Sequence, residues 1–195
     1  MPKYISLDHC CGVILDVQDY FLDQLETSRR SQIKTNTMNF ARLLGYLRIP
    51  IVVTLESPVD QKGSLPQEID EHLRDLAETF EKVPFDLTRE RQIRDHLGRL
   101  NVKQAIIVGC ETDVCILQSC LGLLSLGYDV FVVEDLIFSS SRNVDAAIAR
   151  MKSEGAILLT YKTLYYELIG AFEGGLENLR ATLGPFPKGL PDSLD

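Results

Sequence analysis

The twelve residues GCETDVCILQSC (109–120) bring together side chains that could perform covalent chemistry. They hold three of the chain's five cysteines, and Cys115 stands where a helix is expected to begin. A thiol in the first turn of a helix meets unpaired N–H groups and the positive end of the helix dipole, which stabilise a thiolate. A strand, a tight turn and a nucleophile at a helix start also form a nucleophile elbow. An ordinary first-turn cysteine fits the same spacing.

The neighbouring cysteines have simpler interpretations. A helix over 112–126 carries an apolar stripe with i, i+3, i+4 and i+7 spacing, formed by Leu117, Cys120, Leu121 and Leu124. We therefore expect Cys120 to be a small buried hydrophobic residue, and Cys115 to lie on the other side of the helix. Cys110 ends the preceding apolar run, and we expect a structural role for it.

The number and spacing of the cysteines argue against disulfides and zinc. Their number is odd, and the sequence contains neither a CxxC pair nor a His-x-His pattern. Reduced thiols of this kind are typical of a cytoplasmic protein, which is the location that we predict.

Asp16 is a second candidate for chemistry, because it ends an apolar run that reads as a buried strand. A carboxylate against an apolar strand is costly unless it is paired or reacts. The alternative is a turn or helix cap, which Asp often supplies.

The elements that must position these side chains alternate along the chain. Short runs rich in Val, Ile and Leu predict buried strands at 12–17, 50–55, 103–109, 129–135 and 155–161. Helical patterns lie between and after them, at 31–47, 67–80, 88–100, 112–126, 142–154 and 162–170. This alternation predicts a single domain over 1–195, with an α/β fold built on a doubly wound, mostly parallel sheet. A site is then expected beyond the carboxyl ends of the strands, where Asp16, Glu56 and the loop 109–115 fall.

Composition narrows the classes of partner. The chain has 195 residues, 45% of them hydrophobic, and a net charge of −8. An acidic chain offers no electrostatic footprint for nucleic acid or for an anionic membrane. No segment approaches the roughly 20 apolar residues that span a bilayer, and the first residues do not read as a signal peptide.

Three segments in order resemble one known family. VILDVQDYF (13–21), IIVGCETDVCILQS (106–119) and YDVFVVEDLIFS (128–139) are similar to motifs of the isochorismatase-like cysteine hydrolases. That superfamily includes nicotinamidases and carbamoylsarcosine-type amidohydrolases, and the resemblance covers roughly 12–165. It implies a parallel sheet of six strands and an Asp–Lys–Cys catalytic triad.

The resemblance assigns the triad residue by residue. Asp16 matches the aspartate and Cys115 matches the nucleophile. The segment EKVPFD (81–86) fits the place of the lysine, so Lys82 is the candidate and Lys62 its competitor. Without the resemblance, Lys82 would read as a solvated lysine in a loop.

The resemblance also implies an oxyanion hole and a reaction. A cis peptide at Cys110–Glu111 would turn the backbone N–H groups of Glu111 and Cys115 toward the substrate. The reaction is hydrolysis of a C–N amide or ureide bond of a small molecule, through a thioester on Cys115 and with no cofactor. Phe21, Phe85 and Phe138 are candidates for a cradle around a small planar amide.

Departures from the family define the alternatives. Nicotinamidases carry metal ligands after the second strand, but TLESPVDQKG (54–63) contains no histidine, so no metal is expected. Isochorismatases that cleave a vinyl ether often lack the cysteine; such an activity would survive loss of Cys115 but not of Asp16. A non-catalytic ligand-binding protein and a redox-sensing thiol are the remaining alternatives. A homo-oligomer is an expectation at the level of the family.

Overall fold

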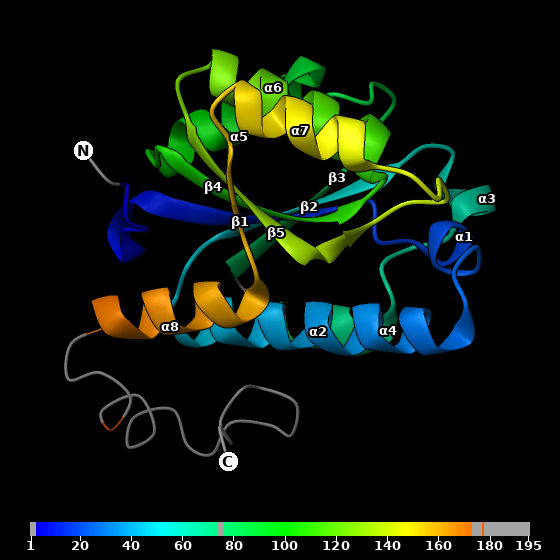
Figure 1. Ribbon diagram of the computed structural model, residues 1–195, viewed down its shortest axis with the longest axis horizontal. Helices are drawn as coiled ribbons and strands as arrows, with labels where there is room; N and C mark the ends of the chain where they lie inside the picture. The colour runs from blue at the N-terminus through cyan, green and yellow to red at the C-terminus, as the bar shows by residue number, and fades with distance from the viewer. Residues whose placement is uncertain (1–2, 74–75, 173–176, 178–195) are drawn as a thin grey trace.

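The computed structural model describes residues 3–73, 76–172 and 177, and these form three layers, with a sheet between two layers of helices (Figure 1). All pairs of neighbouring strands run parallel. The predicted α/β fold on a doubly wound sheet is therefore confirmed. The strands are β1 (Cys10–Leu15), β2 (Ile51–Glu56), β3 (Ala77–Lys82), β4 (Gln104–Cys110), β5 (Asp129–Phe138) and β6 (Ile157–Leu159).

The helices cover both faces of the sheet (Figure 1). One face carries α2 (Thr27–Tyr46), α4 (Gln67–Asp70) and α8 (Tyr161–Ala171). The other carries α5 (Arg91–Leu100), α6 (Leu117–Ser125) and α7 (Asp145–Ser153). The short helices α1 (Asp19–Leu22) and α3 (Val59–Lys62) lie together at one end of the sheet. The described residues also form three short helical turns: η1 (Leu7–His9), η3 (Leu87–Arg89) and η4 (Thr112–Ile116).

The order of the strands places β1 and β4 at the centre. The sheet runs β3-β2-β1-β4-β5-β6, so the chain builds outward from β1 to β3 and then returns to β1's other side. The carboxyl ends of β1 and β4 lie in register there, with Leu15 opposite Gly109. This reversal is the topological switch point at which open parallel sheets bind their ligands.

The core explains why most strands are visible in the sequence. Two hydrophobic clusters lie on the two faces of the sheet, and successive residues of β1 alternate between them, with Val13 in one and Ile14 in the other. All six residues of β1 are buried. Burial on both faces requires apolar side chains at every position, which gives the continuous runs that predicted the strands.

The structure corrects two expected elements. The helix predicted over 67–80 is wrong beyond its first turn, because α4 ends at Asp70 and β3 begins at Ala77. β3 is an edge strand that buries only Phe80 and Lys82, so it has no apolar run to reveal it. The helix expected from 112 begins as the π-helical turn η4 before α6.

Two further expectations concern the extent of the chain. The predicted domain reaches residue 195, but 178–195 lie outside the described residues. In the part of the chain that is described, no helix has both the length and the hydropathy needed to cross a bilayer.

Candidate active site

Four chemically competent side chains meet at the carboxyl ends of the strands. Asp16 follows β1, Glu56 ends β2, Lys82 ends β3 and Cys115 lies in η4, directly after β4. The sheet register aligns them, since Leu15 is opposite Thr54 and Glu56 is opposite Lys82. Residues that are far apart in sequence are thereby brought into one buried cluster.

Asp16 is held in a left-handed backbone conformation, with φ 54°, at the point where β1 ends. Its carboxylate oxygens have separate partners. Oδ2 lies 2.7 Å from Nζ of Lys82, and Oδ1 accepts a hydrogen bond of 2.7 Å from the hydroxyl of Thr54. The carboxylate therefore forms a buried ion pair rather than capping a turn.

β4 passes unusually close to the end of β1. A Cβ atom at Gly109 would lie 2.0 Å from the carbonyl oxygen of Leu15, and its φ is +120°, so only glycine fits. The next residue, Cys110, donates from its thiol to the carbonyl of Asp16 at 3.1 Å. This approach brings the loop that carries Cys115 against Asp16.

Lys82 lies beside Asp16 and Cys115, whereas Lys62 lies beside Glu56; the role of Lys82 in a triad stays a prediction. Nζ of Lys82 donates to Sγ of Cys115 at 3.7 Å, and the side chain is fully buried. Lys62 instead pairs with Glu56, donates to the carbonyl of Ser57 at 3.0 Å, and lies 5.8 Å from the ring centroid of Phe21.

Cys115 is more deeply buried than its sequence position suggested. It is 1% exposed, although we expected it to face away from the core. The buried stripe of this segment runs through Ile116, Cys120 and Leu123 instead of Leu117, Leu121 and Leu124. The π-helical first turn adds a residue to that turn, which changes the helix phase relative to a regular α-helix. The expectation that Cys120 is buried is confirmed.

The charges around the sulfur hold it as a thiol. Burial raises the pKa of Cys115, the charges of Asp16 and Glu56 raise it further, and the ammonium of Lys82 offsets them only in part. The direction of this pKa shift is opposite to the one that the helix start predicted for Cys115. A thiolate has to form together with the transfer of its proton.

Desolvation is the largest single influence on the pKa of each member of the buried ion pair. Burial raises the pKa of Asp16, and the neighbouring Lys82, Thr54 and Cys115 counteract it incompletely. Burial alone would lower the pKa of Lys82, but the charges of Asp16 and Cys115 outweigh it and the pKa is raised. Lys82 consequently stays protonated at neutral pH.

The Cys110–Glu111 peptide is cis, as the resemblance implied. The carbonyl of Glu111 accepts hydrogen bonds from the N–H groups of Val114 and Ile116, at 3.1 and 3.0 Å, which closes η4. The Glu111 carboxylate accepts hydrogen bonds from Ser139 and Ser140, so the loop after β5 is tied to the loop that carries Cys115. The oxyanion-hole role of the N–H groups of Glu111 and Cys115 stays a prediction.

Glu56 belongs to this site, although we did not predict a role for it. Its Oε2 accepts a hydrogen bond from Sγ of Cys115 at 3.2 Å. The signal in the sequence was its place at the end of an apolar strand, which it shares with Asp16. Spacing alone does not show that β2 turns this carboxylate toward a residue on the loop after β4.

The three candidate phenylalanines differ in exposure. Phe21 and Phe138 are buried, at 8% and 4%, in the cluster between the sheet and the helices α2 and α8, whereas Phe85 is 47% exposed. The carbonyl of Phe85 accepts a hydrogen bond from Ser119. A cradle formed by all three around a substrate stays a prediction.

A metal ion fits this cluster poorly. Ligand atoms of Asp16, Glu56 and Cys115 lie within 4.8 Å of one another. The ammonium of Lys82, however, already lies 2.7 Å from Asp16 and 3.7 Å from the sulfur. A metal cation there would be repelled by the ammonium or would have to displace it.

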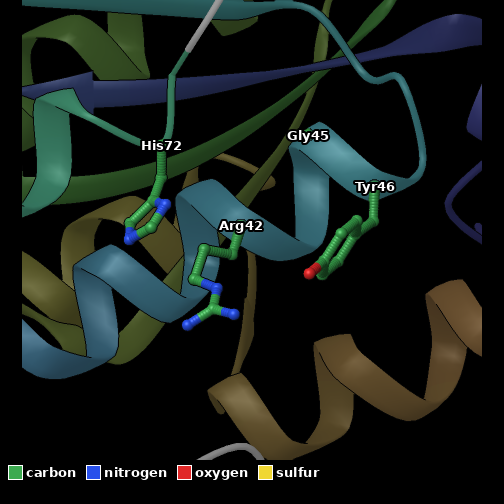
Figure 2. A pocket seen from close by; sticks show the side chains of 4 residues that line it. All are labelled: Arg42, Gly45, Tyr46 and His72. Carbon is green, nitrogen blue, oxygen red and sulfur yellow. The ribbon is translucent and has the colours of Figure 1, made fainter. Parts of the chain in front are cut away.

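A separate hollow lies at the opposite end of the sheet (Figure 2). It is lined by Arg42, Gly45, Tyr46 and His72. Three of these residues lie near the end of α2, just before β2 starts, and His72 shortly precedes β3. The hollow is therefore near the amino ends of the strands, away from Cys115.

The chain is similar to known proteins in sequence and in fold. The isochorismatase domain family matches the chain over residues 10–163. The secreted isochorismatase effector Isc1 of Phytophthora sojae is 35% identical over 164 residues, which cover 80% of this chain and 74% of that protein.

Two solved structures are similar over most of their length. The MAR1 ribonuclease of Caenorhabditis elegans has a TM-score of 0.82 and 26% identity, covering 99% of each chain. YcaC of Pseudomonas aeruginosa, solved with hexane-2,5-diol and covalent acrylamide, has a TM-score of 0.84 and 25% identity, covering 94% of this chain and 92% of YcaC.

Proposed function

The chain belongs to the isochorismatase family, and on that premise we propose that it is a cysteine hydrolase of C–N amide or ureide bonds in small molecules. The observation that carries the proposal is the position of the Cys115 sulfur, 3.7 Å from the ammonium that Asp16 holds at 2.7 Å. A thiol beside a fixed cation and two carboxylates has the parts needed for covalent acyl transfer.

The reaction would begin with attack of the sulfur on the substrate carbonyl carbon. The thiol proton passes to a carboxylate of the site as the S–C bond forms, and the resemblance assigns this proton to Asp16. The proton then goes to the leaving nitrogen as the C–N bond breaks, which leaves a thioester on Cys115. Water hydrolyses the thioester and restores the thiol.

Two groups would stabilise the charges of this path. The backbone N–H groups of Glu111 and Cys115 are the proposed donors to the oxyanion; removing one such donor typically costs about 3–4 kcal/mol of transition-state stabilisation. The ammonium of Lys82 faces both Asp16 and the sulfur, so it favours negative charge on either group.

The test is hydrolysis of a panel of small amides, ureides and activated esters by the wild type, Cys115→Ser and Asp16→Asn. We expect ammonia or amine release by the wild type, and a loss of at least about 1,000-fold in both variants, because each removes a member of a coupled unit. Mass spectrometry should detect an acyl adduct on Cys115 in the wild type alone.

Other outcomes would identify the alternatives. Activity on a vinyl ether that survives Cys115→Ser but not Asp16→Asn would favour the isochorismatase-type reaction. Tight binding of a small molecule without turnover would favour a non-catalytic role. Rapid oxidation of Cys115 by peroxide without hydrolysis would favour redox sensing, although its burial and raised pKa argue against this.

Assembly and location stay predictions. We propose a homo-oligomer, to be measured by analytical ultracentrifugation of the full chain. All five cysteines are free thiols, which agrees with the predicted cytoplasmic location. The Phytophthora relative is described as secreted, so fractionation of cells is the measurement that decides the compartment.

A further inference from the structure

The loop after β5 and the turn that carries Cys115 are joined by a cluster of side-chain hydrogen bonds. Asp113 lies in η4 and Glu111 immediately precedes it. The Asp113 carboxylate accepts hydrogen bonds from the hydroxyls of Ser139 and Ser141, at 2.6 and 2.7 Å. The Glu111 carboxylate accepts from the hydroxyl of Ser140 at 2.9 Å and from its N–H at 3.2 Å. We call these three serines and two carboxylates the serine clamp.

The two carboxylates of the clamp are held by serines and not by cations. Each of their four oxygens accepts a hydrogen bond from the loop after β5. Among the described residues, neither carboxylate belongs to an ion pair. Burial opposes the charge of Asp113, but the hydrogen bonds from Ser139 and Ser141 outweigh it, and the pKa is lowered. Asp113 therefore stays ionised at neutral pH, and hydrogen bonds to an ionised acceptor are about twice as strong as those between neutral groups.

The clamp holds the same turn that carries the proposed catalytic groups. The carbonyl of Glu111 accepts the N–H groups of Val114 and Ile116, which flank Cys115 on either side. The N–H groups of Glu111 and Cys115 are the proposed oxyanion donors, so both belong to this turn. η4 is π-helical, a conformation that is rare and occurs mostly as single turns, frequently at functional sites. A shift of η4 would therefore displace the sulfur and both donors together.

The clamp can act on Cys115 through position without acting through charge. The charges that shift the pKa of Cys115 belong to Asp16, Lys82 and Glu56, and neither clamp carboxylate is among them. Removal of an uncharged serine hydroxyl should therefore leave the ionisation of the thiol unchanged while it loosens η4. Position matters for acyl transfer, because a misplacement of about 1 Å can cost about 100-fold in rate.

We propose that Ser139, Ser140 and Ser141 are positioning residues that hold η4 in the geometry needed for acyl transfer, an inference that rests on the proposed amide hydrolysis. They act through Glu111 and Asp113, which accept their side-chain hydrogen bonds. Ser139 is the central member. Its hydroxyl also lies 3.3 Å from Oε2 of Glu111 and accepts the N–H of Ser141 at 3.1 Å. Loss of this one hydroxyl should loosen both carboxylates.

The experiment compares Ser139→Ala with the wild type in two kinds of reaction at Cys115. Hydrolysis of p-nitrophenyl acetate and of p-nitroacetanilide requires both the sulfur and the oxyanion donors. Alkylation by iodoacetamide requires the sulfur alone, because displacement of iodide forms no oxyanion. We expect kcat for hydrolysis to fall by about 10- to 100-fold, with KM within about 3-fold of the wild type. The rate of alkylation and its pH profile should stay within about 2-fold, because the charges around the thiol are unchanged.

Three further variants guard the interpretation. Ser139→Thr keeps the hydroxyl and should restore kcat to within about 3-fold of the wild type. Ser141→Ala removes one hydrogen bond to Asp113 and should lower kcat by less than Ser139→Ala does. Ser153→Ala is the matched control: it removes an exposed hydroxyl of α7 that donates to the carbonyl of Arg150, and should leave all rates within about 2-fold. Circular dichroism shows whether each variant is folded, and hydrogen exchange of the η4 amides should be faster in Ser139→Ala alone among the Ser139 and Ser153 variants.

The outcomes separate the clamp from the proposed function. An unchanged kcat in folded Ser139→Ala, with an active wild type, would overturn the positioning role and leave the proposed function intact. Equal losses of hydrolysis and alkylation would also overturn it, because the hydroxyl would then act on the thiol itself. The same two results in Ser141→Ala would overturn it if Ser139→Ala is unfolded. A wild type that cleaves the ester but not the anilide would overturn the amidase function alone, and one that cleaves neither would overturn both.

Discussion

Two ion pairs of the same chemical type lie on either side of Cys115, and they differ in depth. The inner pair, Asp16–Lys82, is completely buried, whereas the outer pair, Glu56–Lys62, is partly exposed. The inner pair joins the ends of two strands, while the outer pair joins a strand end to the short helix α3.

This difference in depth should make the two pairs differ in the free energy needed to break them. Desolvation makes the inner pair costly to break, so it is suited to holding a fixed positive charge at the sulfur. Partial hydration makes the outer pair cheaper to rearrange, because water replaces part of the lost interaction. The comparison teaches that the depth of an ion pair sets how much free energy is lost when it is broken.

Breaking the inner pair should have the largest effect on stability. We expect Asp16→Asn to lower the free energy of unfolding by about 3–5 kcal/mol, because it leaves the Lys82 ammonium buried without its partner. Urea denaturation measures this directly. The double variant Asp16→Asn with Lys82→Met should recover part of the loss. A loss below 1 kcal/mol in the single variant would mean that the inner pair is hydrated like the outer one.

The pH dependence of stability should separate the two lysines next. The pKa of Lys82 is raised above its ordinary value of 10.5, so its stabilising contribution is complete below pH 10.5 and is lost as pH rises through the folded-state pKa. Between pH 10.5 and the folded-state pKa of Lys82, this effect should reduce the free energy of unfolding by up to about 1.4 kcal/mol per pH unit.

Urea midpoints at several pH values from 9.5 to 11.5 measure this slope. Lys82→Met should have a shallower slope than the wild type, and Lys62→Met should keep the wild-type slope. The pKa of Cys115 depends on Lys82, so all three proteins carry Cys115→Ser, and the remaining buried thiols then contribute equally to each. Equal slopes in both lysine variants would contradict the assignment of this loss to the inner pair.

Breaking the outer pair should cost less. We expect Lys62→Met to lower the free energy of unfolding by about 1 kcal/mol, because water compensates part of the lost interaction. The effect should shrink in 1 M salt, where charges are screened over a few ångströms. A loss as large as that of Asp16→Asn would show that the two pairs are energetically alike.

A surface ion pair should contribute least to the free energy of unfolding. Lys34 and Glu68 join α2 to α4, with side chains 28% and 46% exposed, and Lys34 lowers the pKa of Glu68. We expect Lys34→Met to change the unfolding free energy by about 0.5 kcal/mol or less. Thermal melts at low and high salt provide the measurement. A cost above that of Lys62→Met would mean that exposure does not rank these pairs.

The sequence predicted the parts of the fold that are buried on both sides. β1, β2, β4 and β5 each gave a continuous apolar run because helices cover both faces of the sheet. β3 gave none, because AETFEK alternates at an edge and exposes both of its glutamates. A hydrophobic pattern in the sequence reveals strands whose side chains are mostly buried, and the edge strand β3 has too few buried side chains to produce such a pattern.

Some residues of the site could also be predicted from the sequence, and others could not. Asp16 and Cys115 stand out because a polar or reactive residue interrupts a strong apolar pattern. Lys82 was reached only through the family resemblance, since nothing local distinguishes it from a loop lysine. Glu56 was placed at the expected site, but its contact with Cys115 was not predicted, because it depends on the direction of a side chain across strands that are not adjacent, which spacing does not encode.

The position of Lys82 on β3 has a consequence for how activity is lost. Among the described residues, β3 pairs with a strand on one side only, with β2, and it buries just two side chains. Such edges exchange their amide hydrogens through local opening, at a lower free energy than the opening of central strands. When β3 peels away, the ammonium leaves Asp16 while β1 and β4 remain paired. We therefore expect the proposed activity to be lost on heating before the sheet melts cooperatively.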